Sequence, residues 1–172
     1  AIVSVFLKVF NEMQGYSGAN PALADLEREL DEKGLYNQFQ DAFLDNYGKP
    51  WIDSRHKFDF IQDDIVDTLV DIDFMSETAA RNWCEKAIEP YTISIHDFAL
   101  KVKDYIDRKG KQHHLVFLVD EIGQYIGDNS QLMLNLQTLT EDLGTICQGR
   151  VWILVTSQQD IDSITKIKGN DF

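Results

Sequence analysis

Two carboxylates directly follow an apolar run in the second half of the chain. Residues 115–119 (LVFLV) are continuously apolar, and Asp120 and Glu121 come next. Such a run without alternation is typical of a strand covered on both faces, as in a parallel sheet. Ligands of open parallel sheets bind beyond the carboxyl ends of the strands, where this acidic pair falls. In an ATP site, Asp120 could hold Mg²⁺ through its oxygen atoms, and Glu121 could polarise the attacking water.

The two carboxylates are expected to do different jobs. Neighbouring residues on an extended chain point in opposite directions, so one side chain could face a metal ion and the other a water molecule. The competing interpretation is that Asp120 and Glu121 simply cap a loop and face solvent. The motif by itself does not decide between these two interpretations, because its structural context must confirm it.

Polar residues follow a second apolar run in the same way. Residues 151–155 (VWILV) predict another buried strand, and Thr156, Ser157 and Gln158 come next. This arrangement resembles the position at which AAA+-like ATPases place a polar sensor residue, which contacts the γ-phosphate or the attacking water. Gln158 fits that position best, with Thr156 and Ser157 as neighbouring nucleotide-binding residues. The alternative is turn chemistry, because Ser and Asp residues commonly begin helices.

A phosphate-binding loop is missing from the sequence. Such a loop needs glycines that let the backbone approach phosphate, followed by Lys and Ser or Thr at a helix start. No GxxxxGK[ST] motif occurs among the 172 residues. In ATPases of this kind the loop precedes the acidic strand, so we expect it upstream of Ala1, in a longer protein of which this sequence is a piece. On this interpretation the chain does not hydrolyse ATP alone.

The elements that position these residues divide the chain near residue 113. Residues 1–112 are predicted to be a mostly helical insertion region, with Asn20, Ser76 and Ser94 as helix N-caps. Residues 113–172 are predicted to be a partial ATPase core: the acidic strand, a crossover helix over 130–146 and the sensor strand. The predicted fold class is therefore α/β, a partial P-loop NTPase-type parallel sheet flanked by helices.

Several segments of this plan are less clearly patterned. The opening residues 2–13 fit a buried helix, although their first part could also be a strand. Apolar residues from Phe58 to Ile72 recur at helical spacing and predict one amphipathic helix. Gly123 and Gly127 predict a flexible turn after the acidic pair, which could approach nucleotide or a neighbouring subunit.

Composition narrows the classes of partner. The chain has 16 Lys and Arg against 29 Asp and Glu, a net charge of -13, which disfavours direct binding to DNA or RNA. Its two cysteines, Cys84 and Cys147, lie far apart and match no zinc or redox pattern, which indicates a reducing compartment. Apolar runs fall well short of the roughly 20 residues that span a bilayer, and no signal peptide is evident. We therefore expect a cytoplasmic protein that does not bind membranes.

Several segments together resemble one protein family. Residues 116–127 (VFLVDEIGQYIG), 136–139 (LQTL) and 152–158 (WILVTSQ) look like the large P-loop ATPase of BREX phage-defence systems. Residues 26–30 (LEREL) and 48–51 (GKPW) are similar to the region which that family inserts between its phosphate loop and its acidic strand. The resemblance covers most of this chain but a minor part of the much larger family protein.

The resemblance implies an AAA+-like ATPase core that uses ATP and Mg²⁺. It also implies self-association and work beside other defence proteins on foreign DNA. Carried over to this sequence, Asp120 and Glu121 are the acidic pair and Gln158 is the sensor. The leading hypothesis is that water attacks the terminal phosphate of ATP in line, with Glu121 as base and Mg²⁺ on Asp120. A noncatalytic helical interaction module and a slow nucleotide-dependent signalling switch remain as alternatives.

Overall fold

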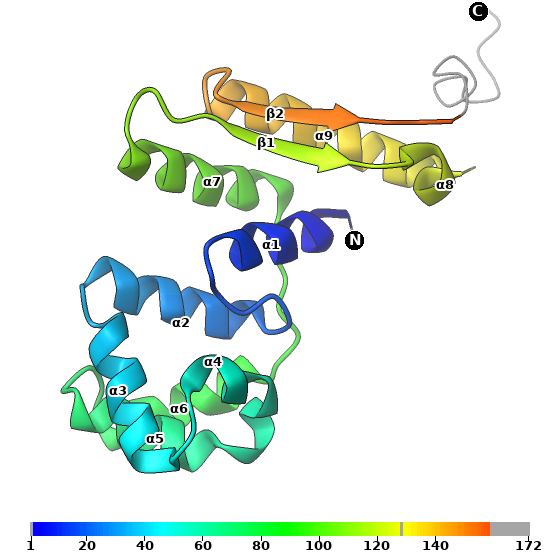
Figure 1. Cartoon of the computed structure of the whole chain (residues 1–172). Helices are drawn as coiled ribbons and strands as arrows, with labels where there is room; N and C mark the ends of the chain where they lie inside the picture. Colours follow the sequence, from blue (N-terminus) through cyan, green and yellow to red (C-terminus); the bar gives the residue numbers. More distant parts are fainter. Residues whose placement is uncertain (1, 128, 159–172) are drawn as a thin grey trace, which may run out of the picture. The chain divides into compact units, whose positions relative to one another are not determined.

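The chain forms two compact units. The computed structural model describes residues 2–127 and 129–158. A helical unit comprises residues 6–92, and a sheet unit comprises residues 2–5 together with the described residues from Ile93 onward. The described residues are mostly helical, and their strands form one small parallel sheet (Figure 1). The coarse prediction, helices first and an α/β arrangement after them, is confirmed.

The helical unit contains the first seven helical elements. They are α1 (Ile2–Met13, which begins in the sheet unit), α2 (Pro21–Glu32), α3 (Tyr36–Tyr47), α4 (Trp51–Ser54), the 3-10 helix η1 (Arg55–Phe60), α5 (Gln62–Asp71) and α6 (Glu77–Ala87). Two predicted caps are confirmed here: the side chain of Asn20 accepts from the backbone N–H of Leu23, and that of Ser76 from Ala79. Each cap satisfies a backbone donor that the first helical turn leaves unpaired. The opening segment is a helix, which excludes the strand alternative.

Aromatic rings fill the centre of the helical unit. Phe39 and Phe43, four residues apart on α3, each meet the ring of Trp51 edge-on at 4.9 Å between ring centroids. All three side chains are almost completely buried. The single amphipathic helix predicted from Phe58 to Ile72 is wrong, because Phe58 lies in η1 and Ile61 precedes α5. Both residues are nevertheless buried, so the apolar pattern identified core positions without distinguishing the two kinds of helix.

A buried carboxylate ties this unit together. Glu27 on α2 is fully buried and accepts hydrogen bonds from the backbone N–H of Ser17 at 2.8 Å, from Trp51 Nε1 at 3.2 Å and from the Tyr36 hydroxyl. Arg55 pairs with the same carboxylate at 2.5 Å. Burial, followed by the charge of Glu27, raises the pKa of Tyr36 above its ordinary value. A charge removed from water needs such compensation to be tolerated.

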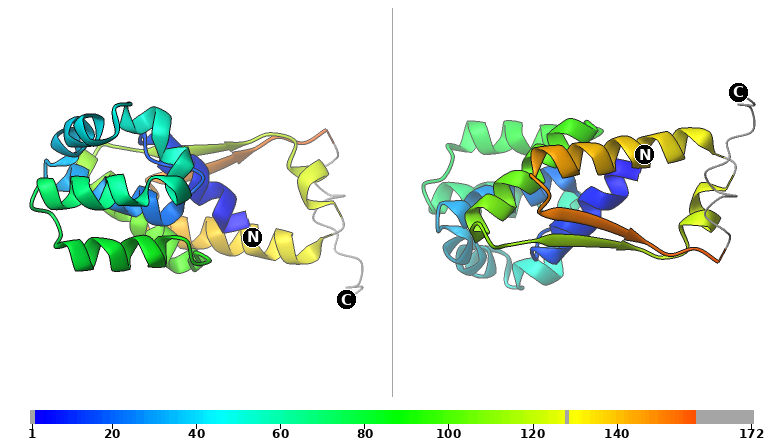
Figure 2. Two further views of the ribbon diagram at one scale, coloured as in Figure 1. Left: turned by 90° about the horizontal axis from the view of Figure 1, so that it is seen from below. Right: turned by 90° about the horizontal axis from the view of Figure 1, so that it is seen from above.

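The sheet unit contains two parallel strands with helices against one face. Its elements are α7 (Ile95–Lys109), β1 (Leu115–Val119), α8 (Ile122–Ile126), α9 (Ser130–Ile146) and β2 (Val151–Val155). The strands pair in parallel, with Leu115 opposite Val151 and Val119 opposite Val155. The helix α9 connects them and packs against both β2 and α7 (Figure 2). The predicted strand, crossover helix and parallel strand are therefore present.

The division of the chain differs from the predicted boundary at 112/113. The helix α7 belongs to the sheet unit, and the division falls between Thr92 and Ile93. Phe98 on α7 packs against Phe117 on β1, with 6.2 Å between ring centroids. The predicted boundary followed the change from helical to strand-like sequence, but the apolar face of α7 is buried against elements that follow it.

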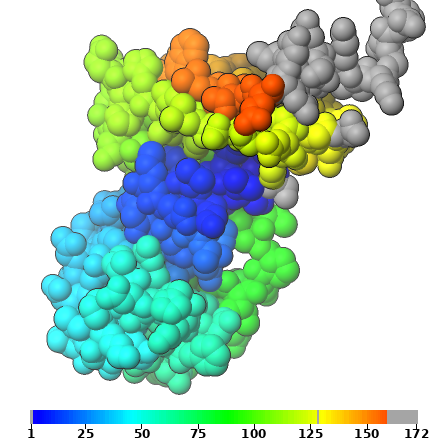
Figure 3. All heavy atoms as spheres, turned by 45° about the vertical axis from the view of Figure 1, so that its right-hand side comes forward, coloured from blue at the N-terminus to red at the C-terminus, as the bar shows by residue number. Residues whose placement is uncertain are grey.

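One face of the sheet is uncovered in the described structure. Val116 lies opposite Trp152 and Leu118 opposite Leu154, and all four side chains are exposed, Leu118 by 79% and Trp152 by 58%. Atoms of both strands reach the surface in Figure 3. The prediction of strands covered on both faces is therefore wrong for the described residues. The continuous apolar run indicated a parallel strand correctly, but α7 and α9 cover only the face that carries Leu115, Phe117 and Val151.

Candidate functional site

The predicted site residues gather at one edge of the sheet. Since β1 and β2 are parallel and end in register at Val119 and Val155, the residues that follow them leave the sheet side by side. Asp120 and Glu121 follow β1, and Thr156 follows β2. The backbone N–H of Thr156 donates to the carbonyl of Val119 at 3.0 Å, which extends the pairing beyond the strands. The carboxyl edge predicted from the sequence thus exists.

Thr156 links the two acidic residues. Its hydroxyl donates a hydrogen bond to Oδ1 of Asp120, and the same oxygen accepts from the backbone N–H of Glu121 at 3.0 Å. A threonine hydroxyl has one proton to donate and lone pairs that accept, so both contacts can exist together. The hydroxyl therefore contacts the carboxylate of Asp120 and the backbone of Glu121.

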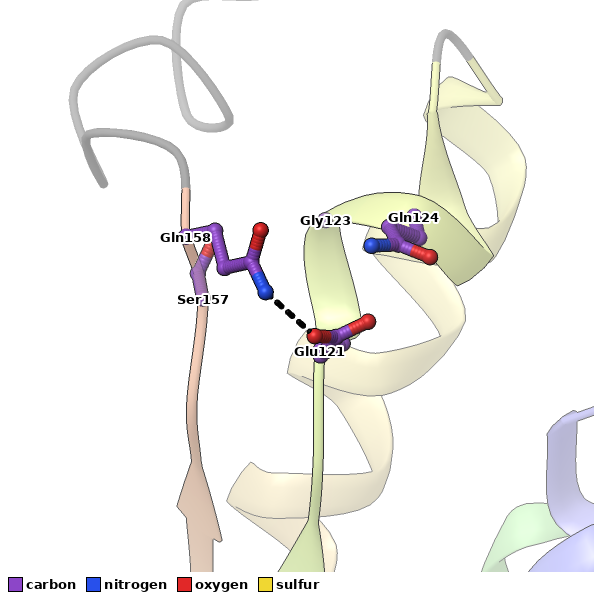
Figure 4. Close-up of a pocket in the computed structure, with 5 residues that line it drawn as sticks. All are labelled: Glu121, Gly123, Gln124, Ser157 and Gln158. Carbon is purple, nitrogen blue, oxygen red and sulfur yellow. Dashed lines mark hydrogen bonds between the residues drawn. The ribbon is translucent and has the colours of Figure 1, made fainter.

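Gln158 contacts the second carboxylate directly. Its Nε2 donates to Oε1 of Glu121 at 2.6 Å, and Figure 4 shows the two side chains pointing toward one another. A small pocket of about 70 Å³ opens beside this pair, and Ser157 contributes to its wall. One water molecule needs roughly 10–15 Å³ on this measure, so the pocket holds a few waters or a group of similar size. A complete nucleotide would extend far beyond it.

Glu121 has an unusual backbone conformation. Its φ is 52° and its ψ is 44°, in the left-handed region, where a residue with a Cβ is disfavoured by about 1–2 kcal/mol. The expectation that Asp120 and Glu121 continue an extended chain is therefore wrong at Glu121. The two carboxylates still have different partners, Thr156 and Gln158, because the chain turns sharply between the strand and the following helix.

The segment after the acidic pair is a short helix and not the predicted flexible turn. Helix α8 begins directly after Glu121 and buries Ile122, Gly123 and Ile126. Gly123 and Gln124 line the small pocket together with Glu121 (Figure 4). The sequence pattern indicated Gly123 as a residue of this segment but did not indicate Gln124 as part of the site. The apolar residues Ile122 and Ile126, four apart, were the signal that a turn of helix packs here.

The site provides few metal ligands of its own. Within the described ranges, no group of three or more His, Cys, Asp or Glu side chains is close enough to hold a metal ion. Mg²⁺ commonly binds through one or two carboxylates plus waters and substrate phosphates. Asp120 is exposed, and one of its oxygens is engaged by Thr156. The second carboxylate oxygen of Asp120 is one ligand atom of the kind that Mg²⁺ binds together with waters and phosphates.

A larger hollow lies elsewhere on the sheet unit. It has a volume of about 350 Å³ and is lined by α9 and β2, including Leu136, Thr140, Ile153 and Val155. Its walls are mainly apolar and do not include the acidic pair. Gln137, Thr140 and Glu141 add polar groups to its lining, but none of the predicted site residues contributes to it.

The cysteines are unsuited to redox or nucleophilic chemistry. Cys84 and Cys147 are both unpaired by a disulfide and buried, as the sequence indicated. Burial raises the pKa of the Cys84 thiol to about 11 and also raises that of Cys147. Because the thiolate is the reactive form, both side chains stay protonated and inert near neutral pH.

Comparisons with known proteins identify no family for this chain. No protein-family model matches it, and no solved structure is significantly similar. Any function of this chain is therefore to be inferred from the residues of the site itself. Among the helices of residues 2–127 and 129–158, none combines the length and apolar character required to cross a bilayer.

Proposed function

We propose that this chain supplies the acidic and polar half of a nucleotide-hydrolysing site in a P-loop, AAA+-like ATPase. One observation carries the proposal: two parallel strands end together, and their following residues pair as Asp120 with Thr156 and Glu121 with Gln158. Ligands of open parallel sheets bind beyond the carboxyl ends of the strands, and carboxylates placed there suit Mg²⁺ binding and activation of water.

Each residue has a role that follows from its contacts. Glu121 accepts the proton of a water molecule that attacks the γ-phosphorus in line, and the bond from that phosphorus to the ADP oxygen breaks. Gln158 orients the Glu121 carboxylate through its amide. Asp120 would hold Mg²⁺, and that ion would supply neutralisation of phosphate charge. Ser157 and Thr156 complete the polar edge.

The small pocket sets the extent of this contribution. With a volume of about 70 Å³, it accommodates the attacking water and a terminal phosphate group at most. The rest of the nucleotide must be held by other groups, chiefly a GxxxxGK[ST] loop, which the 172 residues do not contain. We propose that a longer polypeptide supplies it, so that the present chain alone does not turn over ATP.

The resemblance to the large ATPase of BREX systems gives the proposal a biological setting. In that setting the protein self-associates and acts in the cytoplasm with other phage-defence proteins. The net charge of -13 makes the present segment a poor direct ligand of DNA, so contact with foreign DNA falls to other segments or partners.

The decisive experiment uses the polypeptide that joins the phosphate loop to this chain. We expect Glu121→Gln to lower kcat for ATP hydrolysis by about 10²–10⁴-fold, the usual contribution of a positioned base. Affinity for ATP should change by less than about threefold, because the variant keeps the shape of the side chain. Glu85→Gln, on the exposed surface of α6, is the matched control and should behave as wild type. An unchanged kcat in Glu121→Gln would remove Glu121 from the reaction and refute the proposal.

A further inference from the structure

Thr156 contacts four consecutive residues of the acidic segment. Its backbone N–H donates to the carbonyl of Val119 at 3.0 Å, and its carbonyl accepts from the N–H of Ile122 at 2.9 Å. Between these two, its hydroxyl donates to the carboxylate of Asp120 and accepts from the N–H of Glu121 at 3.0 Å. Every residue from Val119 to Ile122 is thus hydrogen-bonded to this one threonine.

The backbone and the side chain of Thr156 make different contacts. The two backbone contacts continue the pairing of the parallel strands, so any residue other than proline at position 156 could make them. The hydroxyl contacts depend on the side chain. Valine has the same shape but neither donates nor accepts, whereas serine keeps the hydroxyl. The hydroxyl is therefore a separable function of Thr156.

The hydroxyl contacts a residue whose backbone conformation is disfavoured. Glu121 has a left-handed backbone, and its N–H points to Thr156 instead of joining the strand pairing. An unpaired N–H at this position would add to the cost of the turn. The same hydroxyl engages Oδ1 of Asp120, so the second oxygen of that carboxylate lies outside this contact.

We infer that Thr156 is a positioning residue, whose hydroxyl sets both the carboxylate of Asp120 for metal binding and the backbone of Glu121 for its contact with Gln158. The inference rests on the proposed function for the roles of Asp120 and Glu121. It differs from the sequence interpretation, in which Thr156 touches the nucleotide, because the hydroxyl is engaged by the acidic segment itself. Thr156 thus couples the metal-binding residue to the residue that activates water.

Amide hydrogen exchange of the 172-residue protein, followed by NMR, tests the hydroxyl directly. In Thr156→Val, exchange of the Glu121 amide should accelerate at least tenfold relative to wild type. Exchange of the Ile122 amide, which is bonded to the backbone carbonyl of residue 156, should change less than threefold. Thr156→Ser should restore the protection of Glu121. Thr145→Val, at an exposed site on α9, is the matched control and should leave both amides unchanged.

Binding of Mn²⁺ alone provides a second measurement that does not need catalysis. Broadening of the amide signals around Asp120 should require at least threefold more Mn²⁺ in Thr156→Val than in wild type or Thr156→Ser. An unchanged Glu121 amide in Thr156→Val overturns the inference, as does a Thr156→Ser protein that exchanges like the valine variant. Equal acceleration of Glu121 and Ile122 also overturns it, because it shows a general loss of structure.

The proposed function fails in a different way. If wild type shows no broadening near Asp120 with Mn²⁺, and Glu121→Gln retains full turnover in the longer polypeptide, the nucleotide site is refuted. The exchange result for Thr156 then still decides whether the hydroxyl holds the turn at Glu121. The two failures are therefore distinguishable.

Discussion

Gln158 donates a hydrogen bond from its Nε2 to Oε1 of Glu121 at 2.6 Å, across 37 positions of the chain. The contact joins the segment after β2 to the segment after β1. An amide that donates to a carboxylate fixes the orientation of that carboxylate. The pair therefore forms one unit in the proposed reaction.

Removal of the amide should slow the chemical step more than it weakens binding. In the longer polypeptide, we expect Gln158→Ala to lower kcat by about tenfold or more, with KM for ATP changed by less than about threefold. Steady-state hydrolysis over a range of ATP concentrations measures both values. Gln131→Ala, on the exposed surface of α9, is the control. A rise in KM with unchanged kcat would assign Gln158 to nucleotide binding instead.

The left-handed backbone of Glu121 predicts that glycine at this position stabilises the protein more than alanine does, the reverse of the order inside a helix. Glu121→Gly should be more stable than Glu121→Ala by about 0.5–1 kcal/mol, because only alanine keeps the Cβ that is disfavoured there. At Glu141, inside α9, the order should reverse, with alanine more stable by about 1 kcal/mol. Urea denaturation of the four variants measures these differences. The same order at both positions would contradict the conformation found for Glu121.

The buried carboxylate of Glu27 predicts a large loss of stability. Glu27→Gln leaves Arg55 without its charged partner and disturbs three further hydrogen bonds, so it should lower the free energy of unfolding by about 3–5 kcal/mol. Glu29→Gln removes an exposed ion pair with Lys33 on the same helix and should cost less than about 1 kcal/mol. Chemical denaturation compares the two. Similar costs would mean that the Glu27 contacts contribute little.

The buried thiol of Cys84 predicts a loss of stability at alkaline pH. The folded pKa is raised to about 11, against about 8.5 for an unfolded thiol, so the unfolded state ionises first. The contribution of Cys84 is fully present below about pH 8.5 and is lost as pH rises toward 11. We expect the free energy of unfolding to fall by about 1–2 kcal/mol between pH 8 and pH 10.

Cys84→Ala isolates the contribution of this thiol. Urea denaturation under reducing conditions should show a shallower decline between pH 8 and pH 10 than in wild type. Cys147 contributes in the same direction, since burial raises its pKa too, so the decline should not vanish. Identical pH profiles for the variant and wild type would show that the thiol ionises equally in the folded and unfolded states.

Local sequence signals predicted much of the fold. The caps at Asn20 and Ser94, the helix from Ser130 to Ile146 and the two apolar strands all follow from rules that involve neighbouring residues. At Ser94 the cap hydroxyl also donates to the Asp97 carboxylate, a contact that the N-cap prediction did not include. Rules of this kind apply wherever the partner lies within one turn of helix.

What the sequence could not provide depends on partners far along the chain. The place of α7 beside α9 and the four contacts of Thr156 join residues that are tens of positions apart. The left-handed turn at Glu121 was unexpected because glycine is the residue usually found there. Glu27 looked like an ordinary charge on a helix, because its partners come from three other helical elements and from the loop that carries Ser17.

The uncovered face of the sheet carries a tryptophan, Trp152, whose fluorescence reports on whether that face is covered. Trp152 is more than half exposed on that face, whereas Trp51 is buried and Trp83 is partly buried in the helical unit. Indole fluorescence shifts to shorter wavelength when water is excluded from the ring. Any domain, subunit or partner that covers the face of Val116, Leu118 and Leu154 will therefore shift the emission of Trp152 to shorter wavelength. This shift can be measured without a label and before the partner is identified.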